Sequence, residues 1–274
     1  MHGIGNDYIY VNCLDGELEN PSEISVAMSP RHFSVGADGL VMICKSDVAD
    51  AKMRMFNADG SEGKMCGNAI RCVGKYLYDN KLTDKTELKI ETLSGIKILT
   101  LTVENEKVKS VSVYMGKAVF DPALIPVASD EEMINKPITV DGAEVNITAV
   151  SMGNPHSVIY TKGIDGLDLE KIGPSYENHP IFPDRVNTEF VEIIDETTLK
   201  MRVWERGSGE TMACGTGACA VVAASVRNGI CKPNVPVTVK LRGGDLVIKC
   251  SDNYDITMNG TATKAYEGVY EYEL

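Results

Sequence analysis

Two cysteines that are each followed by glycine occur in matching surroundings in the two halves of the chain. Cys66 lies 148 positions before Cys214 (214 − 66), and each Cys-Gly step opens an apolar, helix-like stretch. A cysteine at a helix N-terminus lies near free backbone N–H groups and the positive end of the helix dipole, which favour an anion. We therefore expect both thiols to have lowered pKa values and a useful thiolate fraction near neutral pH.

The same offset of 148 residues relates other landmarks of the sequence. Gly5-Asn6 falls on Gly153-Asn154, Met53-Arg54 on Met201-Arg202, Glu62 on Glu210, and Gly95 on Gly243. A constant offset across dispersed landmarks indicates a duplicated ancestral half that carries one thiol. Two such halves around one substrate would place a thiol on each face of a carbon, where one thiolate removes a proton and the opposite thiol returns one.

Several residues near the two cysteines could bind a substrate with amino and carboxylate groups. Gly67 and Gly215 allow a ligand to approach the helix-start amides, which can hold a carboxylate. His156 is a candidate for tuning a thiol, although a lone histidine is usually structural. Glu205 could orient an ammonium and Arg206 could bind a carboxylate with both nitrogens, although the pair could equally be a solvated pair at a strand end. The amides that could recognise both group types are Asn6, Asn57, Asn68, Asn154 and Asn187.

Composition indicates a globular protein of two ordinary domains. The chain has 274 residues, of which 43% are hydrophobic and 24% charged. Its net charge of −12 argues against binding to a nucleic-acid backbone. No apolar run is long enough to span a membrane, and the N-terminal sequence does not resemble a signal peptide. A cytoplasmic location is therefore expected. The eight cysteines have no C-x-x-C spacing, and neither a disulfide framework nor a zinc site is expected.

Short alternating or β-branched runs predict a strand-rich chain with few helices. Strands are expected near 8–13, 40–44, 52–56, 87–91, 96–103, 110–115, 144–150, 158–160, 189–194, 199–204, 236–241, 246–249 and 255–258. Helices are expected over 68–79 and 217–228, and the second is apolar on every side, which is typical of a buried helix. Residues 17–30 and 165–180 are expected to be surface excursions with short helical parts.

These elements predict an α+β fold of two pseudo-symmetric domains, each a mixed or antiparallel, barrel-like sheet around a central buried helix. The halves are expected to be residues 1–117 and 118–262. We find no dinucleotide-binding, phosphate-binding-loop or nucleophile-elbow motif.

Seven segments of the sequence together resemble the diaminopimelate epimerases. They are His2-Gly3-Ile4-Gly5-Asn6-Asp7, Phe56-Asn57-Ala58-Asp59-Gly60-Ser61, Cys66-Gly67-Asn68-Ala69-Ile70-Arg71-Cys72, Gly153-Asn154-Pro155-His156, Val186-Asn187-Thr188-Glu189-Phe190, Trp204-Glu205-Arg206-Gly207 and Ala213-Cys214-Gly215-Thr216-Gly217. The resemblance covers essentially the whole chain in order. It implies a cofactor-independent enzyme that interconverts LL- and meso-diaminopimelate in lysine and cell-wall precursor synthesis. It also implies that the C-terminal tail, residues 263–274, returns to the first half, and that the enzyme is a homodimer.

The resemblance also implies roles for individual residues. Cys66 and Cys214 would be the acid/base pair, and His156 and Glu205 would modulate the thiols. Substrate contacts would come from Asn6, Asn57, Gly67, Asn68, Asn154, Asn187, Glu205, Arg206, Gly215 and Thr216, and Tyr266 would lie at the dimer interface. No metal ligands are implied.

The sequence departs from the family pattern at two places. The family usually has a short strand before the position of His2, so a shortened first strand is expected here. Some members have glutamine as a substrate contact at the position of Gly39, so this contact is expected to be absent or replaced.

Three other functions remain open at this point. Proline racemases and hydroxyproline epimerases share the logic of two cysteines over one carbon, but they recognise a small ring without a second charged end. A redox protein could cycle Cys66 and Cys214 through a disulfide, although such pairs are usually spaced as C-x-x-C. A non-catalytic amino-acid-binding protein would not need a thiol in each half.

Overall fold

A computed structural model describes residues 1–272, which form two compact units. The first unit comprises Met1–Tyr114 and residues 259–272, and the second comprises Met115–Met258. Both changes of unit fall inside long strands, β9 (Lys107–Lys117) and β18 (Asp255–Gly260). The boundaries expected from the sequence, after residues 117 and 262, stay a prediction.

The first unit is a mixed sheet with two helices. Its sheet runs in the order β3-β4-β5-β7-β8-β9, with parallel pairing of β3 to β4 and of β5 to β7 and antiparallel pairing elsewhere. The elements besides β9 are β1 (His2–Gly3), β2 (Asn6–Asp7), β3 (Ile9–Cys13), α1 (Pro21–Met28), β4 (Gly39–Cys44), β5 (Ala51–Asn57), β6 (Glu62–Gly63), α2 (Gly67–Asp79), β7 (Glu87–Glu91) and β8 (Lys97–Glu104).

The second unit repeats this arrangement and adds two strands at its start. Its sheet runs β10-β11-β12-β13-β14-β16-β17-β18, with β12 parallel to β13 and β14 parallel to β16. The elements besides β18 are η1 (Pro122–Leu124), β10 (Lys136–Val140), β11 (Ala143–Ser151), β12 (Pro155–Tyr160), η2 (Ile164–Gly166), α3 (Leu169–Glu177), β13 (Asn187–Asp195), β14 (Thr198–Glu205), β15 (Gly209–Glu210), α4 (Gly215–Arg227), β16 (Pro236–Leu241) and β17 (Gly244–Cys250).

Equivalent elements of the two units begin 148 residues apart. This offset separates the starts of β4 and β13, of α1 and α3, of α2 and α4, and of β9 and β18. The alternation of parallel and antiparallel strand pairs is also the same in both sheets. The α+β fold class and the duplication expected from the sequence are therefore confirmed.

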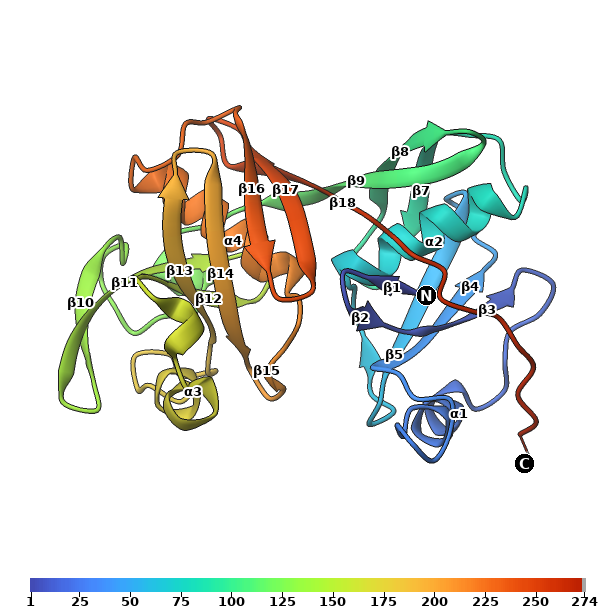
Figure 1. The fold of residues 1–274 in the computed structure, drawn as a ribbon, viewed down its shortest axis with the longest axis horizontal. Helices are drawn as coiled ribbons and strands as arrows, with labels where there is room; N and C mark the ends of the chain where they lie inside the picture. The colour runs from blue at the N-terminus through green and yellow to red at the C-terminus, as the bar shows by residue number, and fades with distance from the viewer. Residues whose placement is uncertain (273–274) are drawn as a thin grey trace. The chain divides into compact units, whose positions relative to one another are not determined.

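The central helices are buried by the strands of their own units. In α4, every residue from Gly217 to Ser225 is buried, and the helix contacts β11, β12, β13, β16 and β17 (Figure 1). Its many alanines give a narrow helix, which lets the strands approach it from several sides. Helix α2 is buried mainly over its first two turns. Each helix therefore presents a fixed N-terminus to its surroundings.

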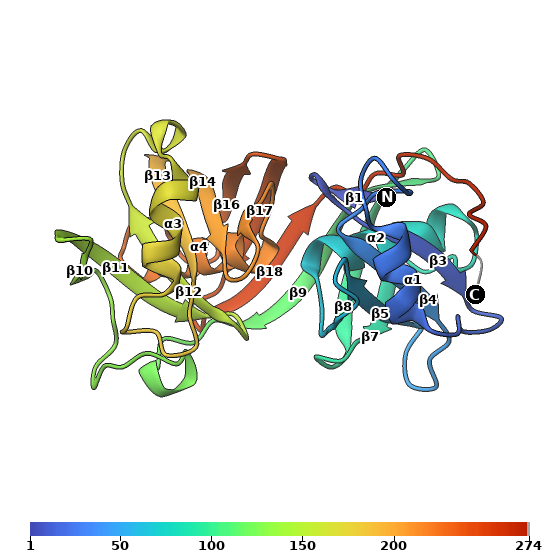
Figure 2. The same ribbon diagram turned by 90° about the horizontal axis from the view of Figure 1, so that it is seen from below.

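The two outer helices occupy the expected surface excursions. Helix α1 packs on β4 and β5, and α3 packs on β13 and β14 (Figure 2). All of the expected strands are present, whereas β10 was missed. Its short apolar pattern contains Pro137 and it pairs on one side only, with β11, as is typical of proline in an edge strand.

The N-terminal hairpin and the returning segment near Thr263 meet in the first unit. Strand β1 has two residues, pairs with β2 and bridges His2 to Thr263, so the returning tail borders the first hairpin. All eight cysteines are free thiols. Within residues 1–272, no helix is long and apolar enough to span a membrane.

Candidate active site

In the first unit, Cys66 caps the N-terminus of α2 with its sulfur. Its backbone is extended (φ −131°), and Sγ accepts a hydrogen bond from the N–H of Ala69 at 3.5 Å. The thiol also donates to Oδ1 of Asn6 at 3.3 Å. Asn6 in turn donates to Asp38 Oδ2 at 2.8 Å, so its side chain is held in place from both ends. The hairpin of β1 and β2 thus delivers Asn6 to the thiol.

A buried arginine fixes the start of helix α2. Arg71 is 0% exposed and donates to the carbonyl of Gly67 at 3.1 Å, to Asn68 Oδ1 at 2.9 Å and to the carbonyl of Thr261 at 3.1 Å. A guanidinium buried with several acceptors orients the groups around it. Arg71 is not among the site residues predicted from the sequence, although a charged residue inside an apolar helical stretch is a usable signal. Asn68, which we expected to contact substrate, bonds to this arginine.

In the second unit, Cys214 caps α4 in the same way. Its φ is −108°, and its Sγ accepts from the N–H of Gly217 at 3.3 Å. The sulfur also lies 3.5 Å from Oγ1 of Thr216. In both units a sulfur therefore occupies the position of an N-cap oxygen, where it bonds to the amide three residues later.

The expectation of a lowered pKa is wrong for Cys214. Burial raises the pKa of this thiol well above its usual value, and the nearby carboxyl groups of Glu205 and Glu189 raise it further. The hydrogen bonds from Thr216 and Gly217 act in the opposite direction but are outweighed. The sequence shows a helix N-terminus, but it does not show how deeply the thiol is buried or which carboxyl groups face it. The environment of Cys214 therefore favours its protonated form.

A chain of polar contacts connects Cys214 to a buried carboxyl group. From Thr216 Oγ1 it passes to Asn154 Nδ2 (3.5 Å), from Asn154 Oδ1 to His156 Nε2 (3.1 Å), and from His156 Nδ1 to Glu189 Oε1 (2.6 Å). The side chains of His156 and Glu189 are both 0% exposed. His156 thus reaches the thiol through two intermediates. Glu189 lies in one of the segments that resemble the family, but no role was predicted for it from the sequence.

The second unit also contains Glu205, Arg206 and Asn187 close together in sequence or space. Glu205 accepts a hydrogen bond from Thr211 Oγ1, and the Arg206 guanidinium donates to the carbonyl of Asp184 at 2.8 Å. Asn187 accepts from the N–H of Arg206 at 2.9 Å and donates to the carbonyl of Pro155 at 2.9 Å. Asn187 thus connects the loop that carries Glu205 and Arg206 to the start of β12.

Three remaining positions behave differently. Asn57 donates to Ser61 Oγ at 3.0 Å at the turn after β5. A Cβ on Gly39, which has φ +154°, would lie 2.0 Å from the carbonyl oxygen of Phe56, so no side chain fits there. Tyr266 is 66% exposed and lines a cavity of about 620 Å³ beneath the returning tail.

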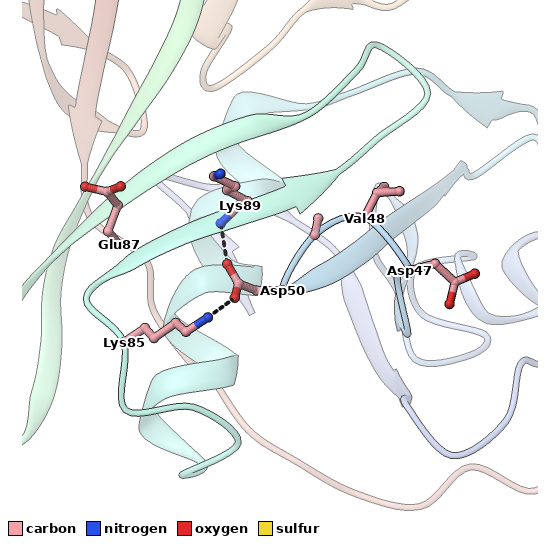
Figure 3. A pocket seen from close by; sticks show the side chains of 7 residues that line it. Asp47, Val48, Asp50, Lys85, Glu87 and Lys89 are labelled. Atoms are coloured by element: carbon pink, nitrogen blue, oxygen red, sulfur yellow. Dashed lines mark hydrogen bonds and ion pairs between the residues drawn. The ribbon is translucent and has the colours of Figure 1, made fainter.

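A separate polar hollow in the first unit has a structural role. Asp50 accepts from Lys85 Nζ at 2.6 Å and from the N–H of Lys89 at 2.7 Å, as the dashed lines of Figure 3 show. These contacts attach the loop before β5 to β7. No predicted site residue lines this hollow, so it is not a candidate active site.

The surroundings of the two thiols differ despite the duplication. At the 148-residue offset, Val41 corresponds to Glu189, Tyr8 to His156 and Asn57 to Glu205. Acidic groups therefore occur beside Cys214 at positions that are uncharged beside Cys66. The two halves supply chemically different thiols on the same helix-start geometry.

The chain is similar to known proteins over nearly its whole length. Residues 1–121 and 148–265 match the family model of diaminopimelate epimerase. A diaminopimelate epimerase from Acetivibrio thermocellus is 58% identical over 270 residues, which cover 98% of this chain and 96% of the relative.

Two solved structures share the fold at low sequence identity. A hydroxyproline epimerase from Agrobacterium vitis superimposes with a TM-score of 0.68 at 15% identity, covering 94% of this chain and 87% of its own. A protein of the PhzF phenazine-biosynthesis family from Bacillus anthracis gives 0.66 at 18% identity, covering 95% and 92%.

Proposed function

The chain belongs to the diaminopimelate epimerase family, and we propose that it interconverts LL- and meso-diaminopimelate without a cofactor. The reaction inverts one α-carbon in lysine and cell-wall precursor synthesis. The observation that carries the proposal is the sulfur cap repeated in both units, with Cys66 on α2 and Cys214 on α4. A thiol that is repeated at a helix N-terminus in both units is better explained by a role as an acid/base pair than by a structural role.

The two cysteines exchange the roles of base and acid according to the direction of the reaction. One thiolate removes the α-proton while the opposite thiol delivers a proton to the other face. Because Cys214 holds its proton at neutral pH, it is the donor in the resting enzyme, and Cys66 removes the first proton. In the reverse direction Cys214 is the base, and the hydrogen bonds from Gly217 and Thr216 stabilise its thiolate.

The other predicted residues bind the substrate. The helix-start amides at Gly67 and Gly215 receive the reacting carboxylate, as helix N-termini favour anions. Arg206 binds the distal carboxylate, in exchange for its present contact with the Asp184 carbonyl. Asn6, Asn57, Asn68, Asn154, Asn187, Glu205 and Thr216 complete the amino-acid contacts directly or by positioning their neighbours.

Two further features belong to the same proposal. The enzyme acts in the cytoplasm. It forms a homodimer in which the exposed Tyr266 ring and the tail around it contact the partner.

Exchange of the α-proton in deuterated water tests the proposed function. The purified protein, with LL-diaminopimelate and no added cofactor, should form the meso isomer and incorporate deuterium at the inverted α-carbon. Proline and hydroxyproline should show no exchange, because they lack the distal amino-acid end. Cys231→Ala, a buried thiol outside the site, serves as the matched control for Cys66→Ser. Absence of exchange with LL-diaminopimelate, or equal exchange with proline, would refute the assignment.

A further inference from the structure

Glu189 is a buried ionisable group that the proposed reaction does not use directly. It lies on β13 and is 0% exposed, and its Oε1 is 2.6 Å from Nδ1 of His156. Its second oxygen, Oε2, is buried and receives no hydrogen bond from residues 1–272. Buried polar atoms are normally bonded, so this carboxyl group calls for a physical explanation.

The environment of Glu189 favours its protonated form. Burial raises the pKa of this carboxyl group, against the opposing effect of His156, and the charge of Glu205 raises it further. An ionised carboxylate with one unbonded oxygen would carry a large desolvation cost here. A protonated carboxyl group, by contrast, can donate from Oε1 to Nδ1 of His156. The imidazole then carries its own proton on Nε2.

A proton on Nε2 of His156 fixes which group donates and which accepts in every hydrogen bond between His156 and Cys214. His156 Nε2–H donates to Asn154 Oδ1, and the amide nitrogen of Asn154 therefore faces Thr216 Oγ1 and donates to it. The hydroxyl proton of Thr216 is then free to point at Cys214 Sγ, 3.5 Å away. A thiolate can only accept, so this orientation is the one that stabilises Cys214 after it has lost its proton.

We propose that Glu189 is a positioning residue, which holds the proton of His156 on Nε2 and thereby directs the Thr216 hydroxyl at the Cys214 sulfur. The inference rests on the proposed acid/base role of Cys214. It applies to one half of the protein only, because Val41 and Tyr8 occupy the positions that correspond to Glu189 and His156. Glu189 and His156 therefore affect the hydrogen bonding of Cys214 and not that of Cys66.

The tautomer of His156 provides a test that is independent of activity. The chain contains four histidines, so ¹⁵N-labelled histidine gives few signals, which single substitutions of the other three would assign. We expect His156 to carry a proton on Nε2. Glu189→Gln retains a donor for Nδ1 and should keep this tautomer. Glu189→Met has no donor and should give a mixture of tautomers. A wild-type ring without a proton on Nε2 would overturn the proposal.

Kinetics then test whether the tautomer matters for the thiol. Glu189→Met should lower kcat about two- to tenfold with little change in KM, as expected when the hydrogen bond to the reacting sulfur is weakened but the Thr216 hydroxyl remains. Glu189→Gln should stay within about twofold of wild type by the same reasoning. Glu192→Met, on the same strand and half-buried, is the matched control and should change neither quantity.

The far end of the chain gives a second variant. Thr216→Val removes the hydroxyl at nearly constant volume and should lower kcat to a similar extent. In the Thr216→Val background, Glu189→Met should have no additional effect, because the connection is already cut. Independent effects of the two substitutions would overturn the proposal, as would a Glu189→Gln variant as impaired as Glu189→Met.

The outcomes remain decisive in two difficult cases. If Glu189→Met does not fold, the proposal is tested by the tautomer of His156 in the wild-type protein and by the kinetics of Thr216→Val. An unchanged kcat in Thr216→Val would contradict the proposal. If the wild-type protein fails to exchange the α-proton of diaminopimelate, the proposed function fails. The tautomer measurement then still shows whether Glu189 holds the proton of His156 on Nε2.

Discussion

Replacement of Gly217 by alanine probes the packing between the second thiol and the buried carboxyl group. A Cβ at this position would lie 2.7 Å from Glu189 Oε1 and 3.2 Å from both Cys214 Sγ and Met201 Cε. The corresponding residue of the first unit is Ala69, which is 0% exposed and also bonds to its cysteine. Alanine is thus compatible with the sulfur cap itself, and the obstacle in the second unit is Glu189.

The expected magnitude follows from two opposing effects. Alanine in place of glycine stabilises a helix interior by up to about 1 kcal/mol. Forcing a methyl group into a filled site costs roughly 1–3 kcal/mol. We therefore expect Gly217→Ala to lower the free energy of unfolding by about 0–2 kcal/mol. We also expect activity to fall, because the contact chain and the Cys214 sulfur are displaced together.

Urea unfolding and steady-state kinetics measure these two effects. The matched comparison is Gly217→Ala in a Glu189→Val background, which reproduces the Ala69 and Val41 pair of the first unit. In the Glu189→Val variant, Gly217→Ala should leave the free energy of unfolding unchanged or raise it, whatever the activity of that variant. If the single variant Gly217→Ala stabilised the protein by about 1 kcal/mol and kept full activity, the placement of the Glu189 carboxyl group would be refuted.

Cys66→Ser and Cys214→Ser should each abolish epimerisation, because serine is too weak an acid and base at neutral pH; near-native turnover of either would exclude the two-thiol mechanism. The rate should be bell-shaped in pH, since one thiol and one thiolate are needed together, and a flat profile would contradict this. Glu205→Gln removes a charge that raises the pKa of Cys214, so the alkaline limb of the pH–rate profile should move to lower pH, and a shift to higher pH would contradict this assignment. Arg206→Met should lower kcat/KM for diaminopimelate by about tenfold or more, as expected for a charged hydrogen bond of roughly 1.5–3 kcal/mol; an unchanged kcat/KM would show that Arg206 contacts only the Asp184 carbonyl.

Local patterns determined the elements and their duplication. The alternating runs predicted every strand of both sheets except β10 and the strands of only two residues. The continuous apolar run 217–226 predicted the central helix of the second unit. Such patterns report which face of an element is buried, and this depends mainly on neighbouring residues. The Cys-Gly steps likewise located both helix N-termini, because the residue that caps a helix is adjacent to it in sequence.

Only the tertiary structure decided how the two thiols differ. Glu189 lies 25 residues before Cys214 (214 − 189) and Arg71 lies 190 residues before Thr261, yet each pair is brought together by folding. The sequence placed a helix dipole at Cys214 and so predicted a lowered pKa, whereas burial and two carboxyl groups raise it. Desolvation and charge–charge interaction depend on distances through space, and residue spacing along the chain does not contain those distances.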